Sequence, residues 1–260
     1  ALYNTESNWD NSVLYIDNCL IKAKDNISGE YIIKNGTRLI GGGAFEDCSS
    51  LTCVTIPESV TEIGDWAFNG CSSLTCVTIP ESVTKIGDHT FYNCRSLTSI
   101  TIPKGVTEIG DEAFSGCISL TSVTIPESIT SIGWNAFSDC SSLTSVQFNA
   151  KNCTSMGNDK SPVFEDCSQL TSLTIGENVT SIPNYAFSGC SSLTSVTIPE
   201  SATKIGKSAF GGCSSLTSVQ FNAKDCASMG DYGFPVFDNC TQLTSLTIGE
   251  NVTSIPYYAF

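Results

Sequence analysis

The chain has 260 residues, of which 40% are hydrophobic and 15% are charged, so it could form one large domain or two ordinary ones. Its net charge of −14 would repel a phosphate backbone, which excludes nucleic acid as an expected partner and favours basic or cationic partners. No apolar run approaches the roughly 20 residues that span a bilayer, and the first residues lack the basic and apolar segments of a signal peptide, so we expect no membrane insertion.

The first 29 residues lack the repeat that fills the rest of the chain. Val13–Ile16 and Cys19–Ile21 have the pattern of two short strands, and Asp17-Asn18 between them is typical of a tight turn. A hairpin in this place would cover the first coil of a repeat structure. We therefore predict that residues 1–29 form an N-terminal capping hairpin.

From residue 30 onward, one motif recurs with a period of 23 residues. Its leading leucine lies at positions 51, 74, 97, 120, 143, 170, 193, 216 and 243. Self-similarity at this period indicates a solenoid, in which each unit is too small to bury a core alone and stacks on its neighbours. Residues 30–45 align without gaps on residues 53–68 and form a degenerate first repeat. Residues 30–260 are therefore predicted to be the solenoid of a single structural domain.

Each unit contains a short strand, an apolar pair and a closing turn. In the first complete unit, which begins at Leu51, the side chains of residues 53–56 alternate outward and inward until Pro57 ends the ladder. Gly64 permits a tight bend, and residues 65–68 are predicted to form a single helical turn. The expected fold is a right-handed, β-rich solenoid with one short helical turn per coil and a single parallel sheet on one face.

Two units, residues 143–169 and 216–242, are 27 residues long. We expect their extra residues to bulge as loops from one edge, where solenoids commonly carry binding residues. The loop residues that we consider candidates for binding are Asn158, Asp159, Asp231 and Tyr232. The alternative is that these units are a duplicated spacer.

The last unit stops at Phe260, before its cysteine, and no polar closing segment follows. An open solenoid end exposes core side chains and a sheet edge. We therefore expect either that the natural chain continues or that the uncapped C-terminal coil makes an end-to-end contact with a partner.

Most of the fourteen cysteines occur once per coil and form a single internal column. Its members are Cys48, Cys71, Cys94, Cys117, Cys140, Cys167, Cys190, Cys213 and Cys240. Buried thiols pack as small apolar side chains, so this column requires no disulfide bonds. Cys53 and Cys76 instead face outward on adjacent predicted strands. Because parallel strands lie about 4.8 Å apart, a disulfide between them is conceivable if their side-chain directions suit it.

The sequence contains no constellation for catalysis, cofactor binding or metal binding. There is no Cys-x-x-Cys pair and no phosphate-binding glycine loop, and the single histidine, His89, is interpreted as an exposed spectator. A column of glutamates could attract Ca²⁺, but Lys104 interrupts it, and solvated acids are the simpler interpretation. These glutamates are Glu58, Glu81, Glu127 and Glu200. We therefore predict no enzyme, no cofactor and no metal.

The outward positions of the predicted strands form a flat array of hydroxyl groups, interrupted by Gln147 and Gln220. The hydroxyl residues are Ser99, Thr101, Ser122, Thr124, Ser172, Thr174, Ser195 and Thr197. Such an array could bind a protein, a glycan or an ordered water layer, although Ser and Thr also simply suit an exposed strand. Together with the two loops, this array is the candidate interaction surface.

The repeat Val-Thr-Ile-Pro-Glu-Ser-Val-Thr-x-Ile-Gly-x-x-Ala-Phe-x-x-Cys-x-x-Leu closely resembles the BspA-like leucine-rich-repeat family. It departs from the general leucine-rich template at Ser59, where Asn or Cys forms a ladder, and at Val60, which comes one place early. The resemblance implies surface or secreted proteins of mucosa-associated bacteria and of a protozoan parasite, some of which adhere to host matrix proteins and other cells.

This resemblance predicts a non-enzymatic adhesion or protein-interaction module that is secreted or lies at the cell surface. The expected partners are host or cell-surface proteins or glycans. Because a fold alone does not determine function, a second hypothesis stays open. In that hypothesis, the chain is a structural spacer that holds another domain or surface away from the cell.

Overall fold

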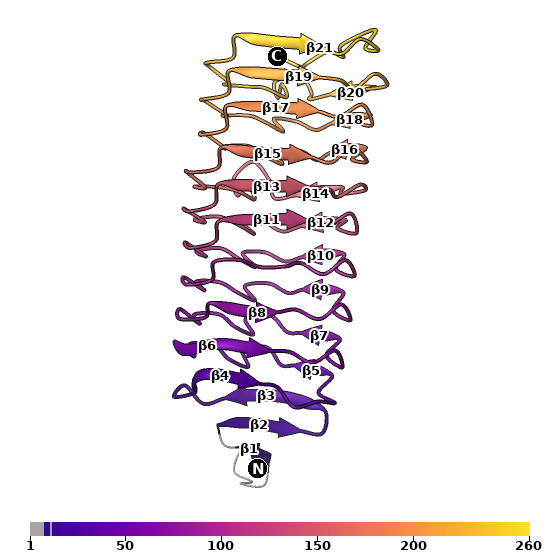
Figure 1. Ribbon diagram of the computed structural model, residues 1–260. Helices are drawn as coiled ribbons and strands as arrows, with labels where there is room; N and C mark the ends of the chain where they lie inside the picture. Colours follow the sequence, from indigo (N-terminus) through magenta and orange to yellow (C-terminus); the bar gives the residue numbers. More distant parts are fainter. Residues whose placement is uncertain (1–7, 11) are drawn as a thin grey trace.

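The computed structural model, which describes residues 8–10 and 12–260, is one elongated stack of coils (Figure 1). At its N-terminal end, β1 (Trp9–Asp10), β2 (Val13–Ile16) and β3 (Cys19–Ala23) pair antiparallel in sequence order. β3 then pairs in parallel with β5 (Leu39–Ile40) of the first coil. The predicted capping hairpin is therefore confirmed, while positions 1–7 and 11 of the predicted cap lie outside the described residues.

One side of the stack, here called the strand wall, carries the strands that begin each leucine-rich unit. Its strands are β4 (Ser28–Ile32), β6 (Ser50–Thr55), β8 (Cys76–Thr78), β11 (Ser122–Ile125), β13 (Ser145–Phe148), β15 (Ser172–Ile175), β17 (Ser195–Ile198), β19 (Ser218–Phe221) and β21 (Ser245–Ile248). They form three parallel three-stranded sheets, β4-β6-β8, β11-β13-β15 and β17-β19-β21.

A second side, the short-strand wall, consists of two-residue strands. These are β5, β7 (Glu62–Ile63), β9 (Lys85–Ile86), β10 (Glu108–Ile109), β12 (Ser131–Ile132), β14 (Ser155–Met156), β16 (Ser181–Ile182), β18 (Lys204–Ile205) and β20 (Ser228–Met229). The strands from β5 to β14 continue the sheet of the hairpin, and β16, β18 and β20 form a separate sheet. The prediction of a single sheet on one face is therefore wrong, because the second apolar pair of each unit is also extended and pairs with the next coil.

Two interruptions of these ladders lie at strands that are followed by proline, although Pro80 also follows β8, which still pairs with β6. The N–H groups of Asn149 and Gly176 donate to carbonyls of the preceding coil at 2.9 and 2.8 Å, which extends the pairing of β11, β13 and β15. Pro199 occupies the equivalent position after β17 and has no N–H to donate. β17 is not paired with β15. On the short-strand wall, Pro183 similarly follows β16, which is not paired with β14.

The segment that closes each coil, here called the turn wall, is not helical, so the predicted helical turn is wrong. Trp66 has a φ of 64°, outside the right-handed helical region. The N–H groups of Trp66 and Phe68 donate to the next coil, each at 2.9 Å, whereas the N–H of Ala67 donates within its own coil to Gly64 at 3.3 Å. Bonds between coils thus replace the local bonds of a helix. The described residues contain no α-helix, and therefore no helix that is long and apolar enough to cross a membrane.

The interior is built from identical side chains stacked along the axis. The phenylalanines of successive units, from Phe45 to Phe237, lie with ring centroids 5.0–5.9 Å apart and nearly parallel planes. The cysteine column packs beside them. The Cys71 thiol donates to the carbonyl oxygen of Phe45 at 3.1 Å, and Cys117 donates to Phe91 at 3.3 Å. Burial raises the pKa of the Cys117 thiol to about 12, so this thiol contributes packing and not a reactive thiolate.

Candidate interaction surface

The structure places all eight predicted Ser and Thr residues on the strand wall, where each is exposed. Parallel register aligns Thr124 with Gln147 and Gln147 with Thr174 across β11, β13 and β15. Ser99 and Thr101 lie in the coil between β8 and β11, outside a regular strand. Gln147 is exposed, and Gln220 is half-buried. The predicted hydroxyl residues therefore share one exposed wall of the stack, with the two glutamines among them.

Two kinds of hydroxyl occur on this wall. Thr75 and Thr144 belong to a column in which each side chain bonds the carbonyl of the equivalent threonine one coil earlier, at 3.0 and 3.1 Å. These hydroxyls hold coils together. Within the described part of the chain, by contrast, the side chains of Thr174 and Thr197 have no hydrogen-bond partner and face solvent. Their hydroxyls are free to bond a ligand.

A hollow of about 890 Å³ lies on the strand wall where β15 and β17 are not paired. Its lining includes Gln147, Asn149, Leu173, Thr174, Glu177, Thr197, Glu200 and Asn222. Gly176 contributes no side chain at the position where other coils carry proline, which leaves this part of the wall open. The hollow therefore combines amides, hydroxyls, two carboxylates and an apolar patch.

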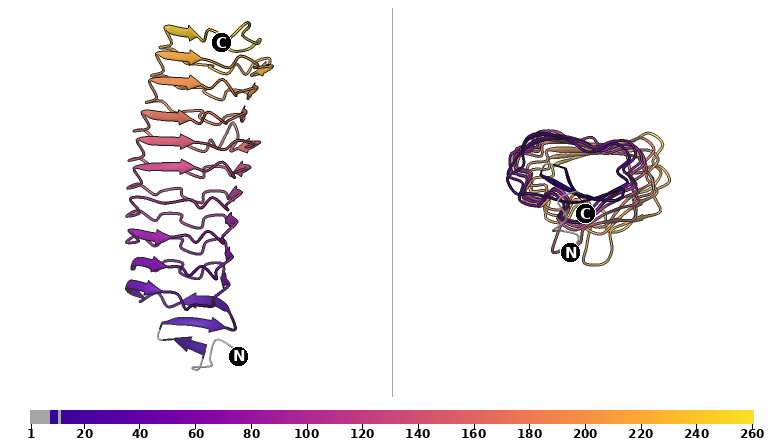
Figure 2. Two further views of the ribbon diagram at one scale, coloured as in Figure 1. Left: turned by 45° about the vertical axis from the view of Figure 1, so that its right-hand side comes forward. Right: turned by 90° about the horizontal axis from the view of Figure 1, so that it is seen from below.

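The loops of the two long units follow β14 and β20. In the view along the axis of the stack, parts of the chain extend beyond the outline that the coils share (Figure 2). Asn158 accepts hydrogen bonds from the N–H groups of Lys160 and Ser161 at 2.9 and 3.0 Å. Asp231 forms an ion pair with Lys207 at 2.8 Å. These contacts help to shape the two loops, and the prediction that both residues take part in binding stays a prediction.

Asp159 and Tyr232, the other two predicted loop residues, are exposed. The side chain of Tyr232 is 84% exposed, and its backbone N–H donates to Asp231 at 2.7 Å. Asp231 and Phe234 are also exposed, so the loops present carboxylates and aromatic rings to solvent.

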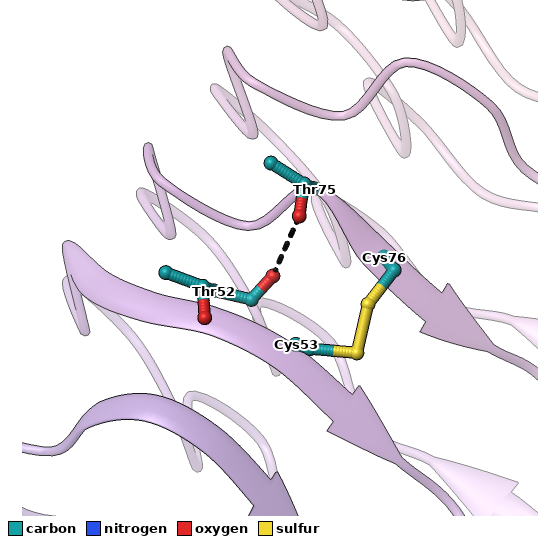
Figure 3. The surroundings of a disulfide bond; sticks show 4 residues. All are labelled: Thr52, Cys53, Thr75 and Cys76. Atoms are coloured by element: carbon teal, nitrogen blue, oxygen red, sulfur yellow. Dashed lines mark hydrogen bonds between the residues drawn. A yellow bond between two sulfur atoms is a disulfide. The ribbon is translucent and has the colours of Figure 1, made fainter.

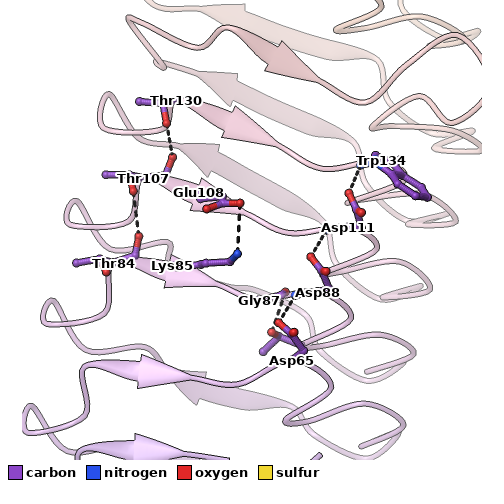
Figure 4. A network of polar contacts seen from close by, with 11 residues as sticks. Asp65, Thr84, Lys85, Gly87, Asp88, Thr107, Glu108, Asp111, Thr130 and Trp134 are labelled. Atoms are coloured by element: carbon purple, nitrogen blue, oxygen red, sulfur yellow. Dashed lines mark hydrogen bonds and ion pairs between the residues drawn. The ribbon is translucent and has the colours of Figure 1, made fainter. Parts of the chain in front are cut away.

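Trp134, which the sequence analysis did not single out, lies beside the first loop. It is 53% exposed and lines a shallow hollow of about 370 Å³ together with Asp88, Asp111 and Asn158. The backbone N–H of Trp134 donates to Asp111 Oδ1 at 2.9 Å, as the backbone N–H of Asp111 donates to Asp88 Oδ1 (Figure 4). Partial burial raises the pKa of the Asp111 carboxyl. Repeat alignment could have found Trp134, since it replaces an aspartate of the preceding coils.

His89 is not the exposed spectator that we predicted. Its ring stacks on Trp66 with centroids 3.8 Å apart, and its Nε2 lies 3.6 Å from the carboxylate of Glu112. The residue has a φ of 54°, and equivalent side chains in this left-handed position lie one above another along the axis. Stacking on the neighbouring coil reduces the exposure of the His89 side chain to 21%.

The glutamate column contains acids that are already engaged by the chain. The Glu81 carboxylate accepts a hydrogen bond from the backbone N–H of Lys104 at 3.1 Å, and the Glu200 carboxylate lies 3.9 Å from Lys224 Nζ. Across residues 8–10 and 12–260, no group of three or more Asp, Glu, His or Cys side chains is arranged to hold a metal ion.

Cys53 on β6 and Cys76 on β8 form a disulfide across directly paired positions of the strand wall (Figure 3). Their Cα atoms are 4.8 Å apart. Beside them, the Thr75 hydroxyl bonds the Thr52 carbonyl at 3.0 Å. The bond therefore joins two coils that hydrogen bonds already align, near the N-terminal end of the stack.

Replacing Cys53 and Cys76 together with serine is expected to lower the free energy of unfolding by about 3 kcal/mol, because the bond closes a 23-residue loop in the unfolded chain. Serine fits both positions, since Ser99 and Ser122 occupy them in later coils. Urea unfolding with and without a reductant measures the change. Reductant should shift the midpoint of the wild-type chain and leave that of the double variant unchanged; equal wild-type midpoints would contradict the expectation.

The model of a protein family described as "BspA type Leucine rich repeat region" matches six copies over residues 37–160 and 160–260. Among solved structures, the leucine-rich-repeat protein of T. pallidum is 28% identical to this chain, with a TM-score of 0.58 over 76% of this chain and 82% of that one. No curated protein matched the chain in sequence.

Two further structures share the fold. A leucine-rich-repeat protein from Bacteroides ovatus is 23% identical, with a TM-score of 0.50 over 94% of this chain and 74% of that one. The pneumococcal vaccine antigen PcpA is 18% identical, with a TM-score of 0.50 over 94% of this chain and 70% of that one.

Proposed function

Because the chain belongs to the BspA-type leucine-rich-repeat family, we propose that it is a non-enzymatic adhesion or protein-interaction module that is secreted or lies at the cell surface. Proteins of repeat architecture present extended binding surfaces formed by many coils. The proposed location and the proposed adhesion to host matrix proteins or other cells rest on what the family resemblance implies. The observation that supports a binding function most directly is the hollow on the strand wall.

This hollow offers a partner several kinds of contact within a small area. Its volume of about 890 Å³ lies in the range of ligand-binding sites in proteins. Thr174 and Thr197 supply free hydroxyls, and the half-buried Leu173 supplies apolar surface. Glu177 and Glu200 lie on its lining, and the net charge of the chain is −14. A protein surface with polar and basic groups is therefore the partner that we propose, with a glycan as the other outcome of the test.

Binding of the purified chain to immobilised matrix proteins, serum proteins and mucosal glycans tests this function. The variant Thr197→Trp fills the hollow, and Thr78→Trp places the same side chain at the equivalent position of β8, outside it. We expect saturable binding that weakens at least tenfold in the first variant and is unchanged in the second. Equal weakening in both variants would place the contact elsewhere on the wall.

The contribution of the loops is tested separately. Replacing residues 157–160 and 230–234 with the sequence of a short unit removes both projections. If binding is unchanged in this variant, the loop part of the proposal fails and the hydroxyl surface remains.

A spacer is the second candidate function, and the uniformity of the strand wall favours it. The sequence Thr-Ser-Val-Thr-Ile occurs unchanged at 121–125 and 194–198, and the phenylalanine stack runs through both coils. Repetition of this kind suits length more than recognition. A correctly folded chain that binds none of the tested proteins and glycans would support the spacer and contradict the adhesion module.

A further inference from the structure

One column of the turn wall carries bulky side chains in a backbone conformation that favours glycine. The residue two places after each glycine bend has a positive φ in successive coils, at Gly43 (60°), Trp66 (64°), His89 (54°) and Glu112 (51°). For bulky residues this region is strained, and such strain is concentrated at functional sites. The same conformation recurs at Asn135, Tyr185, Ser208 and Tyr258, so it belongs to the path of the coil, and at Trp66 and His89 it places two rings one above the other.

The Trp66 ring is fixed on one face by the following coils. His89 stacks against it at 3.8 Å with an interplanar angle of 6°, and the Tyr92 ring lies 5.6 Å from His89 at a steep angle. Glu112 lies 3.6 Å from His89 Nε2. The contact with His89 holds the indole ring of Trp66 with one face toward the following coil.

Gly43 holds the equivalent position one coil earlier, so this column provides no side chain to stack on the opposite face of Trp66. The two coils are in contact there, since the Gly43 N–H donates to the Asp65 carbonyl at 2.9 Å. A Cβ atom on Gly43 would lie 3.2 Å from Glu46 Oε2, so this carboxylate lies beside the gap. Asn69 Nδ2 holds the other oxygen of Glu46 at 3.2 Å.

The gap therefore has an aromatic face on one side and an oriented carboxylate beside it. Trp66 is 40% exposed, so solvent reaches the ring. Other aromatic rings of the chain are covered by its own lysines: Lys24 lies over Trp9 at 4.9 Å, and Lys34 lies over Tyr15 at 4.5 Å. Within the described ranges, no lysine or arginine lies over Trp66.

We propose that Trp66, Glu46 and the gap above Gly43 form a binding site for an arginine side chain of a partner protein. Cations bind over the face of tryptophan in preference to other aromatic rings, and a guanidinium can stack on the ring while it donates to a carboxylate. The net charge of −14 attracts a basic partner. This site lies on the turn wall and does not rest on the function proposed for the strand wall.

Titration of the full chain with N-acetyl-arginine amide tests the site without any partner protein. The chain has only three tryptophans, so the indole N–H signals of Trp9, Trp66 and Trp134 can be followed separately by ¹⁵N NMR. We expect a saturable shift of the Trp66 signal, and at most a small linear shift with the neutral citrulline derivative. Trp134 is the internal control, because it is 53% exposed on another column.

Two variants separate a built site from general attraction to an acidic protein. Glu46→Gln should weaken binding of the arginine derivative at least fivefold. Gly43→Asn should abolish the shift, because asparagine tolerates a positive φ and its side chain fills the gap. Gly189→Asn is the matched control, since Gly189 also has a positive φ, of 77°, and nothing lies near its added Cβ.

Unchanged Trp9 and Trp134 signals show that each variant is folded. If Gly43→Asn does not fold, the binding of the arginine derivative to Glu46→Gln still decides the test. The proposal is overturned if Trp66 shows no saturable shift, if citrulline binds equally, if Trp134 shifts in parallel with Trp66, or if the folded Glu46→Gln variant binds like the wild type. Each of these results leaves the strand-wall function untouched.

Discussion

Replacing Phe114 with alanine is expected to lower the free energy of unfolding by about 3–5 kcal/mol. The Phe114 side chain is fully buried, with ring centroids 5.3 Å from Phe91 and 5.0 Å from Phe137. Its removal leaves a cavity in the middle of the stack and deletes two aromatic pairs. The coils on either side cannot collapse into the space, because hydrogen bonds between coils fix their spacing. Guanidinium unfolding followed by circular dichroism measures the loss.

Ile118→Ala is the matched control for this substitution. Ile118 lies four residues further along the same coil but is 42% exposed, so its truncation should change stability by no more than about 0.5 kcal/mol. Because each coil contacts only its neighbours, the phenylalanine variant could also unfold in two steps, one for each side of the defect. A loss of less than about 1 kcal/mol for Phe114→Ala would show that the ring stack is not the main source of stability.

The period, the core columns and the capping hairpin could be predicted from the sequence because they depend on local patterns. Alternation over a few residues identified the hairpin strands at Val13–Ile16 and Cys19–Ile21, the second of which extends to Ala23 in the structure, and self-similarity placed each leucine, phenylalanine and cysteine in its column. Identical residues at a fixed interval can bury their side chains in a stack only if every coil has the same path. The fold therefore followed from repetition itself.

The path of the turn wall could not be predicted in the same way. The spacing of Trp66, Ala67 and Phe68 fits either one turn of helix or a series of tight turns, and a hydrogen bond from Trp66 to a residue 22 positions away decides between them. The two-residue strands of the short-strand wall are too short to show alternation. In both cases, pairing between coils determined the structure, and no window of local sequence contains that information.

The candidate site shows the same division. Exposure of Thr174 and Thr197 followed from strand alternation, but the hollow beside them depends on the missing pairing of β15 and β17. The stacking of His89 on Trp66 was accessible in principle, since the two residues align in the repeat. Predicting it requires that residues 23 positions apart be treated as direct neighbours along the axis of the stack.

Gly133→Ala is expected to destabilise the chain by about 3 kcal/mol, the upper end of the usual effect of overpacking. A Cβ atom at this position would lie 2.5 Å from the Asp111 backbone nitrogen and 2.6 Å from the Gly110 carbonyl carbon. Both neighbours are backbone atoms and cannot rotate away. The two coils would therefore have to separate, which weakens the hydrogen bond of 2.8 Å from the Gly133 N–H to Ile109. Thermal and urea unfolding measure the effect.

Pro183 occupies the same column as Gly133 and provides the comparison that tests this explanation. It carries a Cβ and lacks an N–H, so it should be as unfavourable as alanine at position 133. Pro183, however, lies in the coil after the first long unit, whose extra loop residues follow Gly157. Pro256 follows the second long unit in the same way. If the insertion creates the room for proline, Pro183→Ala should change stability by less than about 1 kcal/mol. Deleting residues 158–160, by which the segment from Gly157 to Phe164 exceeds that from Gly133 to Phe137, should then make Pro183 costly and Pro183→Gly a rescue. Equal tolerance of alanine at positions 133 and 183 would show that coil spacing does not select glycine, and that the long units have no structural link to the prolines that follow them.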